Sequence, residues 1–343
     1  MRNPSCFLHG PGKAEIEDQP VPELTDPHEV LVHFWRHGGI QTHITAPLVM
    51  GHEASGTVAA VGTSVTRVKV GDRVAIEPGH PCRRCDRCKE GRYNLCPHVR
   101  FAAAPPNTHG LLCKFWKAPE DFVHRVAADR ISLQEVVLLE PLAVAVHGAR
   151  LAQIKPGETV IVTGCGTVGL LCAAVAVRVF GAHRAILFDI VEARVDFARE
   201  YLGVEAYLLD KSATAEENAV AIKHRFDLDE GSVDAVIEAS GAQSSIQLGI
   251  YLVRPGGSYV QAGLGESKPR VPMLALSEKE LRVMGSFRYG ADDFALAVEV
   301  VERRLVVLKP LISTVTPFYR VTEAWEMTGR GEGIKNLIEG VRD

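Results

Sequence analysis

The stretch Thr159-Val-Ile-Val-Thr-Gly164-Cys-Gly166-Thr-Val-Gly169 joins an apolar run of β-branched residues to three closely spaced glycines. An apolar helical stretch from Val168 to Phe180 follows, and the next apolar run ends in Asp189. A Gly-x-Gly-x-x-Gly turn between a strand and a helix binds the pyrophosphate of a dinucleotide, and an acid at the end of the next strand binds the ribose. The stretch therefore predicts a doubly wound parallel sheet with a dinucleotide site.

Each glycine of this turn has a separate expected role. Gly164 allows the tight turn, Gly166 lets the pyrophosphate approach the backbone, and Gly169 lets the helix pack closely on the strand. The N-terminus of the helix supplies N–H donors to the phosphates. Asp189 accepts hydrogen bonds from both ribose hydroxyls and would repel a 2′-phosphate, so NAD is favoured over NADP. Arg194, one turn into the following helix, either covers the adenosine or is a solvated surface residue.

The pattern of strand-like and helix-like stretches along the chain indicates two domains. Strand-like and helix-like stretches alternate from Gly157 onward, and we expect a Rossmann domain over residues 151–279. Residues 1–150 contain short β-like runs separated by Gly and Pro, which indicates an irregular β-rich domain. A helix at 294–303 and a strand at 334–338 are expected to return to this domain, which then comprises residues 1–150 and 280–343.

Four cysteines, Cys82, Cys85, Cys88 and Cys96, lie in one loop over residues 81–97. Thiolates at this spacing can converge on one tetrahedral zinc ion, and four of them leave no open coordination position. The pattern predicts a structural zinc site; a pair of disulfides or four unrelated thiols is the alternative. The other cysteines are scattered through apolar stretches, so we expect buried free thiols and a reducing, cytoplasmic compartment.

The composition argues against several classes of protein. Hydrophobic residues make up 46% of the 343 residues and charged residues 23%, which indicates folded domains with large cores. The net charge is -4 and both signs are interspersed, so no nucleic-acid-binding face is expected. No apolar run has the length of a membrane span, and the first residues contain no apolar signal core. We therefore expect a small-molecule substrate, no nucleic-acid partner and no membrane association.

His52, Glu53 and Glu140 form a second set of candidate metal ligands. The histidine and its neighbouring acid follow Gly51, and Glu140 lies in an apolar stretch, where an unpaired carboxylate is costly. Taken singly, a capped turn or a hydrogen-bonded core acid accounts for each of them. Together with a dinucleotide fold and a zinc loop, they indicate a second zinc site that is open to substrate.

Four features together make the chain resemble the zinc-dependent medium-chain alcohol and polyol dehydrogenases. They are Gly51-His52-Glu53-Ala-Ser-Gly56, the cysteine loop, Glu140-Pro-Leu and the glycine-rich turn. Glu53 beside His52, and Ser286-Phe-Arg-Tyr289, are similar to the sorbitol and xylitol branch. Residues 101–106 and the C-terminal stretch 287–338 look most like the fungal xylitol dehydrogenases. The resemblance runs nearly from end to end. It implies a GroES-like catalytic domain beside the Rossmann domain.

The resemblance also implies a reaction and the residues that carry it. A sugar alcohol, xylitol first and sorbitol or L-arabinitol next, would be oxidised to its ketose by zinc-assisted hydride transfer to NAD. His52 and Glu53 would bind the catalytic zinc, and Glu140 would hold its water or touch the polyol. Arg288 and Tyr289 would contact substrate hydroxyls. The NAD site would include Val168, Asp189, Arg194, Gly263, Leu264, Phe287 and Arg288, and the sheets of this family pair across subunits, which implies a homo-tetramer.

One segment of the family pattern is missing. Family members carry a Gly-Ile-Cys-Gly-Ser-Asp type segment whose cysteine is the third ligand of the catalytic zinc, whereas here Glu29-Val-Leu-Val32 runs directly into His33-Phe-Trp35. The absent segment is about 12 residues long and could span up to ~40 Å when extended. We expect its loss to redirect the chain locally and to remove the end of a core strand. His33, His37 and His43 are the candidates for a replacement ligand.

Three functional hypotheses follow from the gap. The first is a polyol dehydrogenase with impaired activity. Losing an outer-shell partner of a metal ligand lowers metal affinity or activity roughly 10–100-fold, and losing a thiolate ligand itself should lower them at least as much. The second is a zinc-stapled, NAD-binding pseudoenzyme that assembles with an intact relative. The third is a zinc-free NAD(P)H carbonyl reductase. A mis-spliced reading frame, with the natural enzyme intact, is a further explanation of the gap.

Overall fold

The computed structural model describes the chain except residues 1, 11, 39–45, 105–107, 128–129 and 342–343. The chain forms two compact units, one of Met1–Glu140 with Gly290–Asp343 and the other of Pro141–Tyr289. The sequence indicates domain boundaries near residues 150 and 280, whereas the two units meet along the chain at residues 140 and 290. The first of these points lies inside helix α3 (Leu139–Ala152).

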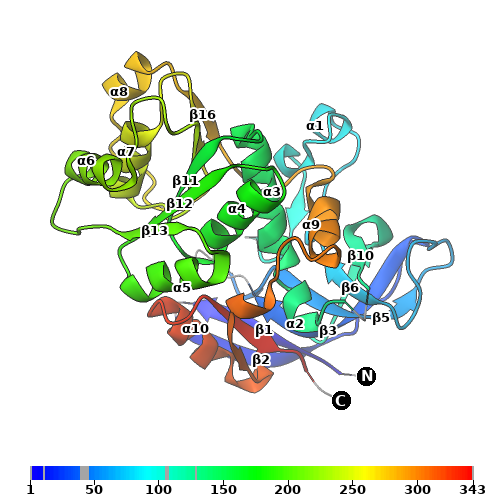
Figure 1. Ribbon diagram of the computed structural model, residues 1–343. Helices are drawn as coiled ribbons and strands as arrows, with labels where there is room; N and C mark the ends of the chain where they lie inside the picture. Colours follow the sequence, from blue (N-terminus) through cyan, green and yellow to red (C-terminus); the bar gives the residue numbers. More distant parts are fainter. Residues whose placement is uncertain (1, 11, 39–45, 105–107, 128–129, 342–343) are drawn as a thin grey trace. The chain divides into compact units, whose positions relative to one another are not determined.

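The unit of Pro141–Tyr289 is built on a six-stranded, parallel sheet (Figure 1). Its strand order is β13-β12-β11-β14-β15-β16. The first strand therefore lies beside the fourth at the centre, as in the doubly wound dinucleotide-binding fold, and that prediction is confirmed. The strands are β11 (Thr159–Thr163), β12 (Arg184–Asp189), β13 (Glu205–Leu208), β14 (Ala235–Glu238), β15 (Ser258–Gln261) and β16 (Arg282–Gly285).

Helices connect these strands and cover the sheet. Because crossovers between parallel strands are right-handed, helices on either side of the central pair cover opposite faces, and α4 packs with α5 while α6 packs with α7. β13 and α6 were not predicted from the sequence, although Thr214 and Glu217 form a capping box at the start of α6. The helices are α4 (Thr167–Arg178), α5 (Glu192–Leu202), α6 (Ala215–Phe226), α7 (Gln243–Leu252) and α8 (Met273–Glu278).

The other unit is β-rich, and its largest sheet has the order β10-β6-β5-β3-β18-β17, with β9 also paired to β3. A smaller sheet has the order β2-β1-β4, and β7 (Gly79–His80) pairs with β8 (Arg100–Phe101). The strands of the two larger sheets are β1 (Asn3–Gly10), β2 (Lys13–Gln19), β3 (Glu29–Gly38), β4 (Leu48–Val49), β5 (Glu53–Val61), β6 (Arg73–Ile76), β9 (Phe115–Pro119), β10 (Val123–Arg125), β17 (Ile312–Thr316) and β18 (Lys335–Glu339). The helices are α1 (Asp86–Lys89), α2 (Leu133–Val136), α9 (Asp293–Glu302) and α10 (Val321–Gly329).

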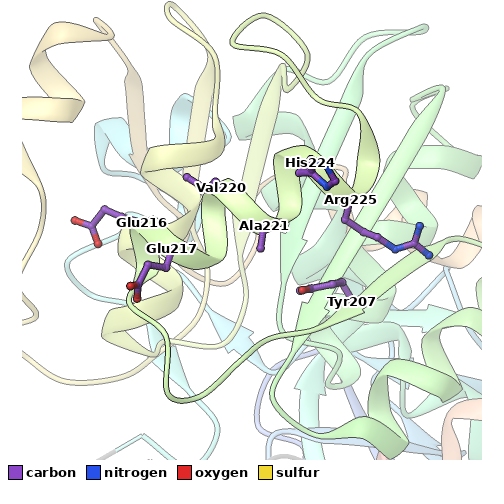
Figure 2. Close-up of a pocket in the computed structure, with 7 residues that line it drawn as sticks. All are labelled: Tyr207, Glu216, Glu217, Val220, Ala221, His224 and Arg225. Atoms are coloured by element: carbon purple, nitrogen blue, oxygen red, sulfur yellow. The ribbon is translucent and has the colours of Figure 1, made fainter.

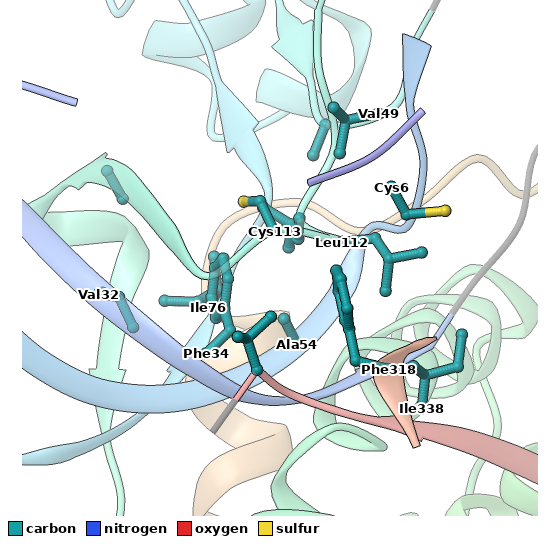
Figure 3. Packing of buried hydrophobic residues seen from close by; sticks show 14 of the residues in the cluster. Cys6, Val32, Phe34, Val49, Ala54, Ile76, Leu112, Cys113, Phe318 and Ile338 are labelled. Carbon is teal, nitrogen blue, oxygen red and sulfur yellow. The ribbon is translucent and has the colours of Figure 1, made fainter. Parts of the chain in front are cut away.

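The hydrophobic core of this unit surrounds β3, as Figure 3 shows. Val32 and Phe34 are fully buried in it, together with Phe318 from the C-terminal part of the chain. β3 runs without a break through Val32 and His33, with a register shift on either side of this junction. The expectation that the missing segment removes the end of a core strand is therefore wrong. The strand continues because Val32 and Phe34 fill the same core on both sides of the junction.

In the part of the chain that the structure describes, no helix has both the length and the apolar character that crossing a bilayer requires.

Candidate active site and metal centre

The four cysteines of the loop come together in a small lobe of the β-rich unit. Their sulfurs all lie within 4.8 Å of one another. The sulfur of Cys88 is 3.9 Å from that of Cys82 and 3.5 Å from that of Cys85. A tetrahedron with Zn–S bonds of about 2.3 Å has edges of ~3.8 Å. All eight cysteines of the chain are free thiols, so these four sulfurs fit a structural zinc ion with a closed coordination sphere.

Backbone N–H groups stabilise thiolate forms within this lobe. The N–H of Cys85 donates to the Cys82 sulfur at 3.4 Å, and the N–H of Cys82 donates to the Cys96 sulfur at 3.5 Å. Hydrogen bonds from the Arg84 and Cys85 N–H groups lower the pKa of Cys82 to about 6, whereas desolvation raises the pKa of Cys88. Thiolate rather than thiol binds metal, so the N–H groups that donate to Cys82 and Cys96 favour a bound cation at these two sulfurs, whereas burial of Cys88 favours its thiol when no metal is bound.

The structure brings His52, Glu53 and Glu140 together in the same unit. Gly51, with a φ of 83° that disfavours other residues, turns the chain into β5 and positions His52 and Glu53 at its start. Glu140 lies in the first turn of α3. One ligand atom from each residue lies within 4.8 Å of the others, and both carboxylates are buried. Two buried carboxylates so close together need a cation or a proton to offset their repulsion.

Lys335 of β18 supplies one such cation. Its ammonium group forms an ion pair with Glu53, and the two side chains are only 12% and 7% exposed. The cluster contains no thiol, because the cysteines outside the lobe lie elsewhere in buried positions; they are Cys6, Cys113, Cys165 and Cys172. His52 and Glu140 therefore offer a divalent metal one nitrogen and one carboxylate oxygen, with Glu53 shared between the metal and Lys335. This donor set fits zinc less well than a set with a thiolate.

His33 is not part of this cluster. Its ring is buried against Phe115, with ring centroids 5.1 Å apart, and its Nε2 lies 3.2 Å from the carbonyl oxygen of Val341. The proposal that His33 replaces the missing cysteine is therefore not supported. The side chain of His37 and all of His43 lie outside the described residues.

The glycine-rich turn has the geometry that a dinucleotide needs. Gly164 has a φ of 97°, and a Cβ on Gly169 would lie 1.8 Å from the carbonyl oxygen of Gly164, so both positions require glycine. A Cβ on Gly166 would meet nothing within 4 Å, which leaves open space beside the first turn of α4. Val168 lies in this first turn and is partly exposed. The turn therefore fits a pyrophosphate at the helix N-terminus.

Asp189 ends β12 and is buried beside this turn. Its carboxylate accepts the N–H of Cys165 at 2.8 Å, which ties the end of β12 to the glycine-rich turn. It also accepts the N–H groups of Ile190 at 2.7 Å and Val191 at 2.9 Å. Arg194 follows in the first turn of α5. The acid is thus held at the carboxyl end of a central strand, where this fold binds the ribose.

The predicted substrate segment has an unusual backbone. Arg288 has a φ of 57°, in the left-handed region that favours glycine, and its guanidinium carbon lies 4.5 Å from the centre of the Phe287 ring. Phe287 is 48% exposed, whereas Tyr289 is only 2% exposed. Residues that adopt such conformations often lie at binding sites, where neighbouring contacts hold them.

Two family models match the chain. The alcohol dehydrogenase GroES-like domain matches residues 26–128, and the zinc-binding dehydrogenase domain matches residues 167–303. The probable D-xylulose reductase A of Aspergillus clavatus is 48% identical over 355 aligned positions, which cover 100% of this chain and 98% of that protein. The chain belongs to the zinc-dependent polyol dehydrogenase family. The D-xylulose reductase A of Aspergillus oryzae is 46% identical to this polyol dehydrogenase over 353 positions, covering 99% of the chain and 97% of that protein.

Solved structures of dehydrogenases share the fold of this polyol dehydrogenase. L-idonate 5-dehydrogenase from Escherichia coli is 26% identical with a TM-score of 0.88, over 99% of this chain and 98% of that one. An Escherichia coli oxidoreductase of unknown specificity is 29% identical with a TM-score of 0.90, over 100% of both chains. Membership of this family implies zinc and a nicotinamide cofactor, and it makes the chain an enzyme by family.

The length of the Aspergillus clavatus alignment bears on the missing segment. It spans 355 positions, whereas this polyol dehydrogenase has 343 residues, so at least 12 aligned positions have no residue in the chain. That number equals the length of the segment that the sequence analysis finds absent before His33.

Glu238 is a buried acid that no sequence motif singled out, and it holds the chain next to two of the predicted cofactor residues, Gly263 and Leu264. This fully buried carboxylate ends β14, and it accepts hydrogen bonds from the Thr163 hydroxyl at 3.1 Å and the Gln261 amide at 2.6 Å. Its backbone carbonyl also accepts the N–H of Gly263 at 2.7 Å, next to Leu264, which is 90% exposed. An acid that ends an apolar strand, in Val-Ile-Glu-Ala-Ser-Gly, is the sequence signal for this role.

A separate cavity of about 700 Å³ lies on the dinucleotide-binding unit, as Figure 2 shows. Side chains of β13 and α6 line it, among them Tyr207, Val220 and Arg225. None of the predicted site residues lines it, and it does not touch the glycine-rich turn. We assign it no part in the chemistry.

Proposed function

We propose that this polyol dehydrogenase oxidises a sugar alcohol to its ketose with NAD as the hydride acceptor, and that xylitol is favoured over sorbitol and L-arabinitol. The full-length similarity to proteins named D-xylulose reductase supports the substrate. The convergence of His52, Glu53 and Glu140 within 4.8 Å in the GroES-like unit is the observation that carries the proposal. Asp189 supports NAD over NADP, because a buried carboxylate repels a 2′-phosphate.

The proposed reaction assigns a task to each of these groups. The C–H bond of the carbinol breaks and both of its electrons move with the hydrogen to the nicotinamide, while the O–H bond breaks and its proton passes to solvent. A bound zinc ion lowers the pKa of an alcohol and polarises a carbonyl. His52 and Glu53 would hold the ion, and Glu140 would hold its water or accept a hydrogen bond from the polyol. Lys335 holds the carboxylate of Glu53 in place.

Polar groups that face the substrate would give the site its preference for polyols. In the proposal Arg288 and Tyr289 donate hydrogen bonds to hydroxyl groups of the sugar alcohol. A site built to bind hydroxyls rejects a simple alcohol, because its polar groups would then be left unpaired.

We further propose that turnover is low because zinc binds this cluster weakly. A thiolate ligand is absent, and Lys335 competes with the metal for Glu53. Zinc content by mass spectrometry and xylitol-dependent NADH formation, before and after addition of zinc, test the proposal. One zinc per chain as purified, with activity that rises as zinc is added, supports it. Two tightly held zincs and a kcat of roughly 1–10³ s⁻¹ without added zinc would refute the impairment.

A second candidate function is an NAD-binding assembly partner without turnover. The thiol-free cluster and the absent alignment positions favour it. It requires one zinc per chain, NADH binding, and no xylitol oxidation at any zinc concentration. One zinc with NADPH-linked reduction of carbonyl compounds would instead indicate the zinc-free reductase.

We also propose that the chain forms homo-oligomers, up to a tetramer. β16 is the edge strand of the parallel sheet, and its Val283 and Met284 side chains are 44% and 42% exposed. Met273 and Leu274 of the same unit are more exposed still, at 60% and 72%. Exposed apolar edge strands pair with other chains unless they are protected, and a second copy would cover this one.

A further inference from the structure

The cysteine lobe forms hydrogen bonds with the residues that directly follow the proposed substrate segment, Arg288-Tyr289. Tyr93, in a short 3₁₀ turn between two cysteines of the lobe, has its hydroxyl oxygen 2.9 Å from the carbonyl oxygen of Gly290. The N–H of Ala291 donates to the carbonyl of Gly91, also in the lobe, at 2.8 Å. The lobe therefore holds two consecutive backbone units that directly follow Tyr289.

Close packing leaves little freedom at this contact. A Cβ on Gly290 would lie 3.0 Å from the carbonyl oxygen of Gly91, and a Cβ on Gly91 would lie 3.1 Å from the Cβ of Ala291. Contacts this short would make the neighbouring atoms give by a few tenths of an ångström, and Gly91 also has a φ of 75° that favours glycine, so the two segments are closely packed. A displacement of the lobe is thus transmitted to the backbone at residues 290–291.

The backbone around the contact is held in conformations that a free loop would leave. Arg288 has a φ of 57° and Asp292 a φ of 66°, and neither is glycine. Such conformations persist only where surrounding contacts hold them. The lobe supplies two of these contacts, and the Asp293 carboxylate, which accepts the N–H of Gly290 at 2.8 Å, supplies another.

A buried network behind Tyr93 fixes its hydroxyl group. Tyr93 also hydrogen-bonds with Glu77, which is 3% exposed, and the Nε2 of His124 lies 2.9 Å from the second carboxylate oxygen of Glu77. The His124 ring stacks on Phe294 of α9, with ring centroids 4.6 Å apart. Burial raises the pKa of Tyr93, so the hydroxyl keeps its single proton, which is shared between the Glu77 carboxylate, the nearer acceptor, and the Gly290 carbonyl.

We propose that Tyr93 is a positioning residue, through which the metal-loaded lobe holds the Arg288-Tyr289 segment in its substrate-binding conformation. The proposal rests on the proposed function for the identity of the substrate, and on the contacts above for the coupling. It gives the structural zinc a second effect: loading of the four-cysteine site sets the affinity for the polyol as well as the stability of the lobe.

The first test compares Tyr93→Phe with a matched control, Tyr251→Phe. The Tyr251 hydroxyl also bonds to a glutamate, Glu216, but in the dinucleotide-binding unit. Amide hydrogen exchange across residues 287–294 should be roughly three- to tenfold faster in Tyr93→Phe, since about one net hydrogen bond is lost. It should be unchanged in the control. Equal exchange of this segment in both variants would overturn the proposal.

The second test removes the lobe zinc from the full-length protein with a chelator. Exchange across 287–294 should then rise in the wild type and rise less in Tyr93→Phe, because the two changes act through the same contact. In steady-state kinetics with xylitol, Tyr93→Phe should raise the KM for xylitol roughly three- to tenfold and leave kcat and the KM for NAD unchanged.

The two readouts separate this proposal from the proposed function. Absence of xylitol oxidation in every variant, with the exchange differences intact, would refute the substrate and leave the coupling standing. Normal exchange across 287–294 after zinc removal would refute the coupling, whatever the activity.

Discussion

The ammonium group of Lys335 forms an ion pair with the buried carboxylate of Glu53, which lies beside His52 and Glu140, and the lysine side chain is only 12% exposed. Glu53, one of the carboxylates expected to bind the catalytic zinc, is thus already paired with a positive charge. The pair links β18, near the C-terminus, to the start of β5. The Lys335 side chain therefore competes with a metal ion for Glu53, and the ion pair allows the cluster to fold without a metal.

Replacing Lys335 with methionine should therefore make stability depend on metal. Removing one partner of a buried ion pair leaves an unpaired charge and typically costs about 3–5 kcal/mol. We expect Lys335→Met to lose stability of this order in chelator and to regain most of it on addition of zinc, measured by denaturant unfolding. Lys117→Met, which breaks the more exposed pair with Glu29, is the control and should show no rescue by zinc. Loss of stability without zinc rescue would show that the cluster does not bind the metal.

The zinc content of the purified protein should depend on the four cysteines of the lobe and not on the other cysteines. Cys88→Ser is expected to lose about one zinc per chain, because the closed site needs four thiolates. Cys172→Ser, at a fully buried thiol in α4, should keep that zinc even if its stability falls. Elemental analysis of the two purified variants makes the comparison. Unchanged zinc in Cys88→Ser would contradict the assignment of the lobe.

Cofactor preference should change when Asp189 loses its charge. Asp189→Asn keeps an acceptor for the N–H of Cys165 but removes the negative charge that favours ribose hydroxyls over a phosphate. We expect NADH to bind about tenfold more weakly, as for loss of a charged hydrogen bond, and NADPH to bind relatively better. Fluorescence titration with each nucleotide measures both effects. A wild-type protein that binds NADPH more tightly than NADH would count against the NAD proposal.

Glu120 should make the β-rich unit sensitive to acid. Burial acts to raise its pKa, but the N–H groups of Thr66 and Arg67 and the His28 ring outweigh it and hold the pKa at about 2. Because the folded pKa lies below the ordinary value, the ionised form stabilises the fold above about pH 4.3, and this stabilisation is lost as the pH falls towards 2.

The Glu120→Gln variant tests this dependence. It should be clearly less stable than wild type at pH 6, and the difference in unfolding midpoint should shrink as the pH is lowered to 3. The same substitution at Glu326, an exposed helix residue, should show little effect at either pH. A difference for Glu120→Gln that stays constant between pH 6 and pH 3 would rule out the assigned pKa.

The edge strand β16 should mediate self-association. Val283→Lys places a charge on the exposed apolar edge and is expected to shift the protein to a smaller species in analytical ultracentrifugation. Val220→Lys is the control, since Val220 is 69% exposed on α6 beside the cavity in Figure 2. Identical sedimentation of both variants and wild type would exclude this edge as an interface.

Short-range patterns were enough to predict the dinucleotide turn and the cysteine lobe. Gly164, Gly169 and Asp189 act within one strand-turn-helix-strand unit, and the four cysteines act within one loop, so backbone geometry and spacing specify them. The alternation of strands and helices likewise predicted the parallel sheet, because each element buries its apolar face against its neighbours. The family motifs named His52, Glu53 and Glu140, which the fold brings together.

Contacts between distant parts of the chain could not be predicted, because no local sequence pattern marks them. Lys335 reaches Glu53, and Tyr93 reaches Gly290 across 197 residues, only because β18 and α9 return to the β-rich unit. The continuity of β3 at Val32–His33 likewise depends on the core that packs around it, which no local propensity reports. Spacing along the chain therefore specified which ligands exist, and long-range packing specified which charges and hydrogen bonds those ligands must share.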